Sequence, residues 1–152
     1  MERLPVNGGE LEFEAKGTGE PVVLIHGGIT GEAFHCLLNE PALTDRYQVT
    51  LYHRRGFLGS THHTGPFSIA QQAQDALAVV QRVALGRAHV AGHSYGGATA
   101  LQLALGAPDA VHSLALLEPP LAVDCAESFF ARMGPSGQAY ESGRSRLRQG
   151  IP

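Results

Sequence analysis

The chain has few cysteines, no long apolar segment and no excess of basic charge, and each shortage excludes a class of protein. Its 152 residues include two cysteines, too few for a disulfide scaffold and typical of a reducing compartment. Eleven basic and fourteen acidic residues leave no electrostatic footprint for nucleic acid or an anionic membrane. The apolar runs are short, and the N-terminus has no apolar signal core. We therefore expect a cytoplasmic globular protein without nucleic-acid or membrane partners.

What the sequence does contain is an alternation of strand and helix patterns. Asn7-Gly8 predicts a hairpin, and the apolar run at 22–25 predicts a strand that is buried on both faces. Further strands are expected over 47–52, 88–92 and 111–117, with helices over 31–38, 68–85 and 95–105. This order predicts an α/β fold, a mostly parallel sheet with helices on both faces. We expect its core in residues 1–122, and in 123–152 an irregular or helical segment where a lid region could start.

A G-x-S-x-G motif at Gly92-His93-Ser94-Tyr95-Gly96 lies where a predicted strand turns into a helix. Such a sharp reversal forces the serine into strained backbone angles and leaves no room for side chains at residues 92 and 96. The serine hydroxyl then lies at the carboxyl end of the sheet, where open α/β folds bind ligands. The pattern predicts Ser94 as a nucleophile, with Gly92 and Gly96 as the glycines that the turn needs.

A second glycine-rich turn, His26-Gly27-Gly28, directly follows the buried strand at 22–25. Acyl transfer needs two N–H donors directed at the oxyanion that develops in the transition state. We assign these donors to the backbone of Gly28 and of Tyr95. This chemistry needs no cofactor and no metal ion, and we interpret His62-His63 as polar surface rather than a metal site.

These motifs, together with 52–60 and 114–119, make the sequence resemble the α/β-hydrolase family over residues 5–120. The resemblance implies Ser94 as the nucleophile and the strand order 1-2-4-3-5-6. A serine at this position argues against the branches with an aspartate nucleophile, the epoxide hydrolases and haloalkane dehalogenases. The family's chain order of serine, acid and histidine makes Glu118, just after a strand, a candidate acid. Asp124 is a weaker one, and Glu118 could instead cap the strand end or pair with an arginine.

The base that would activate Ser94 is not evident in these 152 residues. The histidines are at positions 26, 35, 53, 62, 63, 89, 93 and 112, and seven of the eight precede Ser94. His112 is expected at the start of a strand, the wrong end of the sheet, whereas His26 and His93 are expected to bond to backbone. We expect a chain cut after its sixth strand, with the base further on, and little activity in these residues alone.

The sequence is compatible with three hypotheses about function. The first is a serine hydrolase that cleaves a small-molecule ester or a related acyl bond. The second keeps the scaffold for haloperoxidase-like chemistry without a cofactor, for C–C bond hydrolysis or for a lyase reaction, since fold does not decide among these. The third is a non-catalytic binding protein or pseudoenzyme. In each case an exposed edge strand at 111–117 invites self-association.

Overall fold

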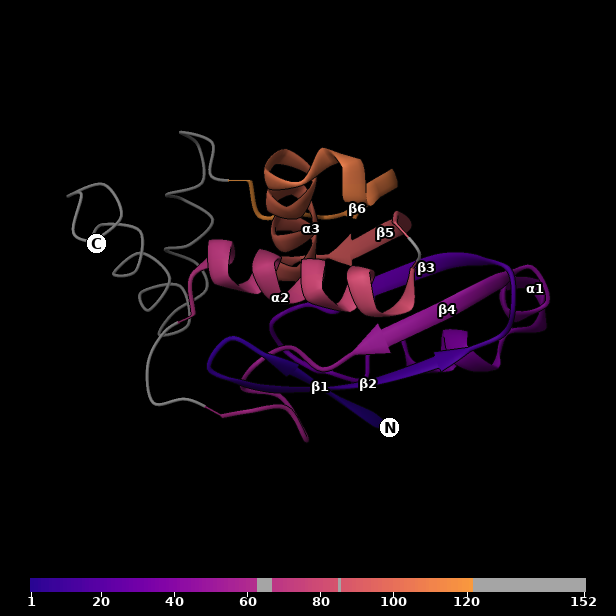
Figure 1. Ribbon diagram of the computed structural model, residues 1–152, viewed down its shortest axis with the longest axis horizontal. Coiled ribbons are helices and arrows are strands. Elements are labelled where there is room, and N and C mark those ends of the chain that lie inside the picture. Colours follow the sequence, from indigo (N-terminus) through magenta and orange to yellow (C-terminus); the bar gives the residue numbers. More distant parts are fainter. Residues whose placement is uncertain (63–66, 85, 122–152) are drawn as a thin grey trace. The chain divides into compact units, whose positions relative to one another are not determined.

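The computed structural model describes residues 1–62, 67–84 and 86–121, and six strands of these residues form one sheet (Figure 1). The strands are β1 (Glu2–Val6), β2 (Gly9–Lys16), β3 (Glu20–Ile25), β4 (Tyr47–Tyr52), β5 (Ala88–His93) and β6 (Val111–Leu117). Their order in the sheet is β1-β2-β4-β3-β5-β6. β2 pairs antiparallel with β1 and β4, and the pairs β4–β3, β3–β5 and β5–β6 are parallel. The predicted fold class and strand order are confirmed.

The helices are α1 (Pro41–Thr44), α2 (Ile69–Val83) and α3 (Tyr95–Gly106), with short 3-10 turns η1 (His35–Asn39) and η2 (Pro108–Ala110). Ser68 caps α2, because its hydroxyl accepts a hydrogen bond from the Gln71 N–H at 3.1 Å. The prediction of a helix over 31–38 was wrong. That stretch is a turn followed by η1, of which only Leu38 is buried, so it has no apolar face long enough to stabilise an α-helix.

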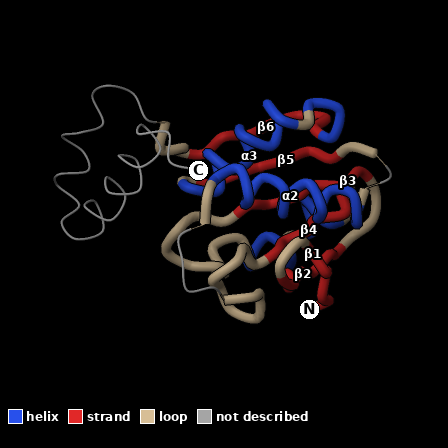
Figure 2. Tube along the Cα trace, turned by 60° about the vertical axis from the view of Figure 1, so that its left-hand side comes forward, coloured by secondary structure: helices blue, strands red, loops and turns tan. Residues whose placement is uncertain are grey.

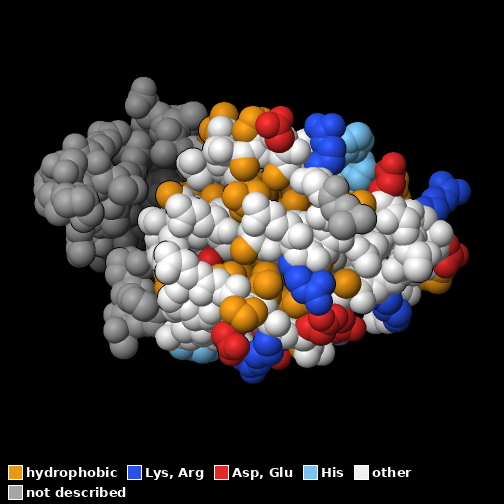
Figure 3. Space-filling model, viewed as in Figure 1, with side chains coloured by type: hydrophobic (Ala, Val, Ile, Leu, Met, Phe, Trp, Pro, Cys, Tyr) orange, Lys and Arg blue, Asp and Glu red, His pale blue; other side chains and the backbone are white. Residues whose placement is uncertain are grey.

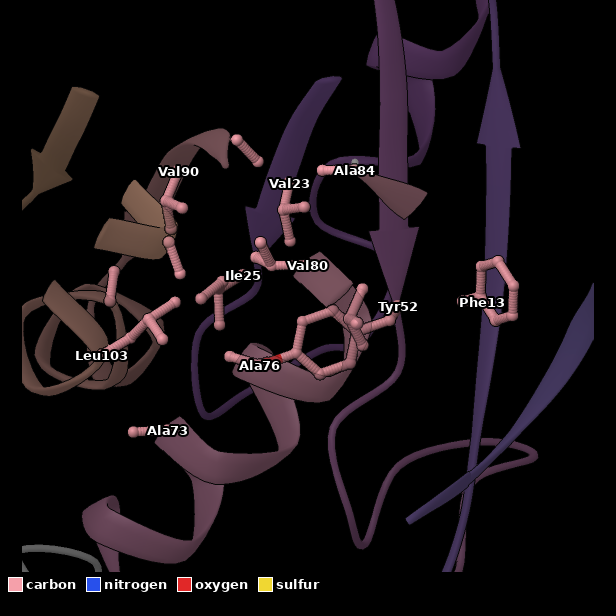
Figure 4. Close-up of a cluster of buried hydrophobic side chains, with 14 of the residues drawn as sticks. Phe13, Val23, Ile25, Tyr52, Ala73, Ala76, Val80, Ala84, Val90 and Leu103 are labelled. Atoms are coloured by element: carbon pink, nitrogen blue, oxygen red, sulfur yellow. The ribbon is translucent and has the colours of Figure 1, made fainter. Parts of the chain in front are cut away.

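The core lies on both faces of the sheet. On one face, α2 and α3 pack side by side against the strands, and buried side chains such as Tyr52, Ala76 and Val80 interlock there (Figures 2 and 4). On the other face, Leu38 of η1 packs with Leu51 and other residues of a smaller cluster. The burial of both faces holds the carboxyl ends of the parallel strands in fixed positions, and the candidate site lies at those ends.

The outer surface carries acidic and basic side chains interspersed on the face seen in Figure 3. β6 lies at one edge of the described sheet, and Leu116 and Leu117 near its end are 36% and 43% exposed. Self-association through this edge stays a prediction. None of the helices in the described part of the chain has the length and apolar character that crossing a bilayer requires.

Candidate active site

Ser94 lies at the turn between β5 and α3, and its backbone angles are φ 52° and ψ −122°. This is a strained conformation for a residue with a side chain. The Ser94 N–H donates to the Leu117 carbonyl at 2.8 Å, and the Ser94 carbonyl accepts from the Gly97 N–H at 2.8 Å. Hydrogen bonds from β6 and α3 therefore maintain the strained turn. The turn is present as expected, whereas the role of Ser94 as a nucleophile stays a prediction.

Gly92 and Gly96 allow the elements around Ser94 to approach each other. A Cβ atom at Gly92 would lie 2.6 Å from the carbonyl carbon of Gly96. A Cβ atom at Gly96 would overlap the carbonyl oxygens of Ile25 and His26 at the end of β3. Because these obstacles are backbone atoms that are held in the sheet or the helix, neither position has room for a larger residue.

The loop after β3 lies directly against this turn. A Cβ atom at Gly27 would be 3.4 Å from the Ser94 Cβ, and one at Gly28 would be 3.9 Å from the Tyr95 Cβ. Tyr95 is the first residue of α3, so its backbone belongs to the positive end of the helix dipole. The structure thus brings together the two residues that the sequence analysis assigned as oxyanion donors.

His26 at the start of this loop is fully buried and has both ring nitrogens engaged. Its Nε2 accepts from the Arg54 N–H at 3.0 Å, so the hydrogen is on Nδ1, which donates to the Gly27 carbonyl at 2.8 Å. Burial, reinforced by the nearby charge of Arg54, lowers the pKa of His26 to about 4. His26 is therefore a neutral structural residue that is bonded to backbone, as the sequence analysis expected.

Glu118 follows β6 with a φ of 48°, and its side chain is 91% exposed. Its carboxylate lies 4.0 Å from Nε2 of His93, the residue before Ser94. The structure therefore places the candidate acid at the same end of the sheet as Ser94, although its role stays a prediction. Asp124 lies outside the described residues.

The two-histidine sequence at 62–63 lies only partly in the described structure. His62 bonds through Nε2 to the Leu58 carbonyl at 3.0 Å, and His63 lies outside the described residues. Across the described ranges, no three His, Cys, Asp or Glu side chains are grouped closely enough to hold a metal ion.

A family model for the alpha/beta hydrolase fold matches residues 20–148 of this sequence. The chain belongs to the alpha/beta hydrolase fold family. It is 38% identical over 108 residues to the "Putative carbamate hydrolase RutD" of Azorhizobium caulinodans. This match covers 71% of the present chain and 40% of the relative. It is also 34% identical over 114 residues to a dihydrolipoyllysine-residue acetyltransferase component of an acetoin cleaving system from Cupriavidus necator. That match covers 75% of this chain and 30% of the relative.

Among solved structures, the crystal structure of a hydrolase from Pseudomonas aeruginosa PA01 superimposes on this chain with a TM-score of 0.74. The sequence identity is 28%, and the match covers 86% of this chain and 50% of that one. The chain thus spans less than half the length of the curated relatives named above. The fold is that of the alpha/beta hydrolases, and different members carry different activities on it.

Two polar clusters beside this site, one around Arg54 and one around His53, were not predicted from the sequence. Arg54 donates to the loop after β3, and His53 Nδ1 donates to the Glu12 carboxylate at 2.8 Å. That hydrogen bond lowers the pKa of Glu12. A signal existed in the run His53-Arg54-Arg55 directly after a buried strand, because charged residues there must find partners. The sequence could not say which partners these are.

The first prediction concerns the steric fit at the turn. Gly96→Ala should destabilise the protein by about 1–3 kcal/mol, because its Cβ would collide with the backbone of β3. The matched control is Gly106→Ala in the same helix, where a Cβ would meet nothing within 4 Å. Alanine favours a helix over glycine by up to roughly 1 kcal/mol, so the control should be neutral or stabilising. Urea unfolding measures both, and equal effects would contradict the steric explanation.

The second prediction concerns pH. Above the ordinary pKa of 6.5, His26 is neutral whether the chain is folded or unfolded. As the pH falls from 6.5 toward 4, only the unfolded chain takes up the proton, so the free energy of unfolding decreases. The shift corresponds to a loss of roughly 3 kcal/mol, reached by about pH 4.

The measurement is urea unfolding of the wild type, His26→Gln and the exposed-site control His112→Gln between pH 7 and 4. His26→Gln should lose stability less steeply over this window than the wild type, since its side chain cannot be protonated. The control should follow the wild type. Parallel curves for His26→Gln and the wild type would show that the imidazole is not held neutral in the folded state.

Proposed function

We propose that the complete protein is a serine hydrolase of the alpha/beta hydrolase family that cleaves a carboxylic ester or a related acyl bond. The observation that carries the proposal is the strained Ser94 at the carboxyl end of the sheet, in contact with the glycine loop at residues 27–28. A strained backbone is costly and persists where the surrounding structure demands it, and such residues concentrate at active sites. Family membership supports the same conclusion.

In the proposed reaction, Ser94 Oγ attacks the carbonyl carbon of the substrate while a base takes the hydroxyl proton. The carbonyl π electrons move to the oxygen, and the N–H groups of Gly28 and Tyr95 stabilise that oxyanion. The oxyanion collapses, the bond to the leaving group breaks, and the leaving group takes the proton from the base. Water then attacks the acyl-enzyme by the same route, which releases the acid and restores the Ser94 hydroxyl.

The base and its orienting acid complete the proposal. Glu118 is the candidate acid, since it lies at the carboxyl end of β6 beside the Ser94 turn. The family order of serine, acid and histidine places the base C-terminal to Glu118. The last histidine of the sequence is His112, so we propose that the base comes from chain beyond these residues.

A carbamate is the second candidate substrate. The favouring observation is the 38% identity to the RutD protein of Azorhizobium caulinodans, whose name describes a carbamate hydrolase. Carbamates and esters share the carbonyl that Ser94 would attack, and they differ in the group attached to it. Side chains that line the substrate pocket would therefore distinguish the two, while the chemistry at Ser94 would be the same.

The test of the function is active-site labelling of the complete gene product with a fluorophosphonate, followed by peptide mapping. Labelling on Ser94 is the expected result, because the reagent reacts with serine hydroxyls that a base activates. Hydrolysis rates for a p-nitrophenyl ester and a p-nitrophenyl carbamate then choose between the two substrate classes. A protein that stays unlabelled, or that is labelled at another serine, would overturn the proposal and favour the non-catalytic reading.

A further inference from the structure

Arg54, the second residue after β4, is 3% exposed, and its guanidinium group makes no ion pair among the described residues. Burial of a guanidinium group without a carboxylate is costly, so its hydrogen bonds must hold it there. Its neighbour Arg55 is also buried and has the carboxylate of Asp75 as a partner. The two adjacent buried arginines therefore have different partners. Arg55 pairs with a carboxylate, whereas Arg54 binds the loop after β3.

The guanidinium of Arg54 binds two successive carbonyl groups of that loop. Nε donates to the His26 carbonyl at 3.1 Å, and Nη2 donates to the Gly27 carbonyl at 2.7 Å. The Gly27 carbonyl also accepts from His26 Nδ1 at 2.8 Å. The backbone N–H of Arg54 in turn holds His26 through Nε2 at 3.0 Å. Three of these four hydrogen bonds come from Arg54, and two of the four end on the same carbonyl.

That carbonyl belongs to the peptide group whose nitrogen is the N–H of Gly28. A peptide group is planar, and in the trans form its C=O and N–H point in opposite directions. The described residues have no cis peptide bonds. Hydrogen bonds to the Gly27 oxygen therefore also set the direction of the Gly28 N–H. A positive charge at the oxygen polarises the same group and makes its N–H a stronger donor.

Arg54 contacts the second oxyanion donor as well. Its guanidinium carbon lies 4.8 Å from the ring centroid of Tyr95 and 5.0 Å from that of Phe57. A guanidinium group attracts the face of an aromatic ring at such distances. The Tyr95 hydroxyl donates to the Phe67 carbonyl at 3.1 Å, which holds the far end of the same ring. One side chain thus links the peptide group of residues 27 and 28 to the first residue of α3.

We propose that Arg54 is a positioning residue for the oxyanion site. Its side chain holds the Gly28 N–H in the direction that stabilises the oxyanion. The inference rests on the proposed function of Ser94, Gly28 and Tyr95. It also predicts which step suffers when Arg54 is lost. The oxyanion forms only after the substrate has bound, in the tetrahedral intermediate and the transition states on either side of it. A misdirected donor therefore lowers kcat and leaves KM almost unchanged.

The test compares Arg54→Met and Arg54→Lys with the wild type in the complete gene product. With p-nitrophenyl acetate as substrate, Arg54→Met should lower kcat about 10–100-fold, less than the 10²–10³ lost when a donor is removed outright. Its affinity for phenylboronic acid, which forms a tetrahedral adduct with an active serine, should fall by a similar factor. Arg54→Lys keeps the charge but not the planar guanidinium group, so its kcat should lie between those of the wild type and Arg54→Met.

The matched control is Arg82→Met, since Arg82 also lies near an aromatic ring, that of Phe13 at 5.8 Å, but is 55% exposed. It should leave kcat unchanged. An Arg54→Met variant with wild-type kcat, or with a raised KM alone, would overturn the inference. If Arg54→Met does not fold, Arg54→Lys is measured well below its melting temperature. A lowered kcat then supports the inference, and a wild-type kcat or a raised KM alone overturns it.

A separate measurement distinguishes failure of this inference from failure of the proposed function. An unlabelled wild type would overturn the proposed function. Amide hydrogen exchange at Gly28, followed by NMR, needs no activity and reports whether Arg54 holds the loop. Faster exchange in Arg54→Lys than in Arg82→Met supports the positioning, whereas equal exchange overturns it even if Ser94 is labelled.

Discussion

Ser94→Ala should reduce kcat of the complete protein by about 10⁶-fold, the size of loss found when the nucleophile of a catalytic triad is removed. The physical reason is that alanine has no oxygen atom to form the acyl-enzyme bond, so only the oxyanion donors and substrate binding remain. Ester hydrolysis under saturating substrate measures the effect. Since the variant removes only the hydroxyl oxygen and its proton and adds no bulk, its melting temperature should remain close to that of the wild type.

The matched control for this variant is Ser113→Ala. Ser113 lies near the start of β6, and its hydroxyl contacts His89 Nδ1 at 2.7 Å, at the opposite end of the strands from Ser94. It should leave kcat unchanged. A Ser94→Ala protein that keeps wild-type turnover would show that another group attacks the substrate. The proposed mechanism would then be wrong, although the family membership would stand.

Asp75→Ala should destabilise the protein by about 3–5 kcal/mol, because it leaves the cation of Arg55 buried without its partner. The pair is bidentate, with Nε to Oδ2 at 2.5 Å and Nη2 to Oδ1 at 2.8 Å, and both side chains are at most 3% exposed. Arg55 also donates to the carbonyls of Asn7 and Gly8 in the hairpin between β1 and β2. The loss therefore loosens α2 and the hairpin together. Urea unfolding at pH 7 measures the change.

The comparison that isolates burial is Glu2→Ala, which breaks the exposed pair of Arg82 and Glu2 at 3.3 Å. Exposed pairs contribute about 0–1 kcal/mol, since water solvates both charges when the pair is broken. The double variant Arg55→Met with Asp75→Leu should recover much of the stability lost in Asp75→Ala, because it removes the unpaired charge. A loss at Asp75 no larger than that at Glu2 would contradict the prediction.

The local features of the site could be predicted because their causes are local. The G-x-S-x-G pattern at a junction of strand and helix predicts a sharp turn from the steric needs of five residues alone. The structure has the strained turn there. The hairpin at Asn7-Gly8 follows from backbone preferences in the same way. The helix expected over 31–38 failed because its stability depended on packing that the segment does not have.

By itself, the sequence determined the α/β fold class, the turn at Ser94 and the glycine loop at 26–28. Only the tertiary structure decided what the buried charges do. Arg54 meets a carbonyl 27 residues away, and His53 meets Glu12, 41 residues away. Such partners come together because neighbours in the sheet are distant in the sequence, β4 lying between β2 and β3. Hydrogen bonds depend on angles and distances of a few tenths of an ångström, which arise from the packing of the whole core.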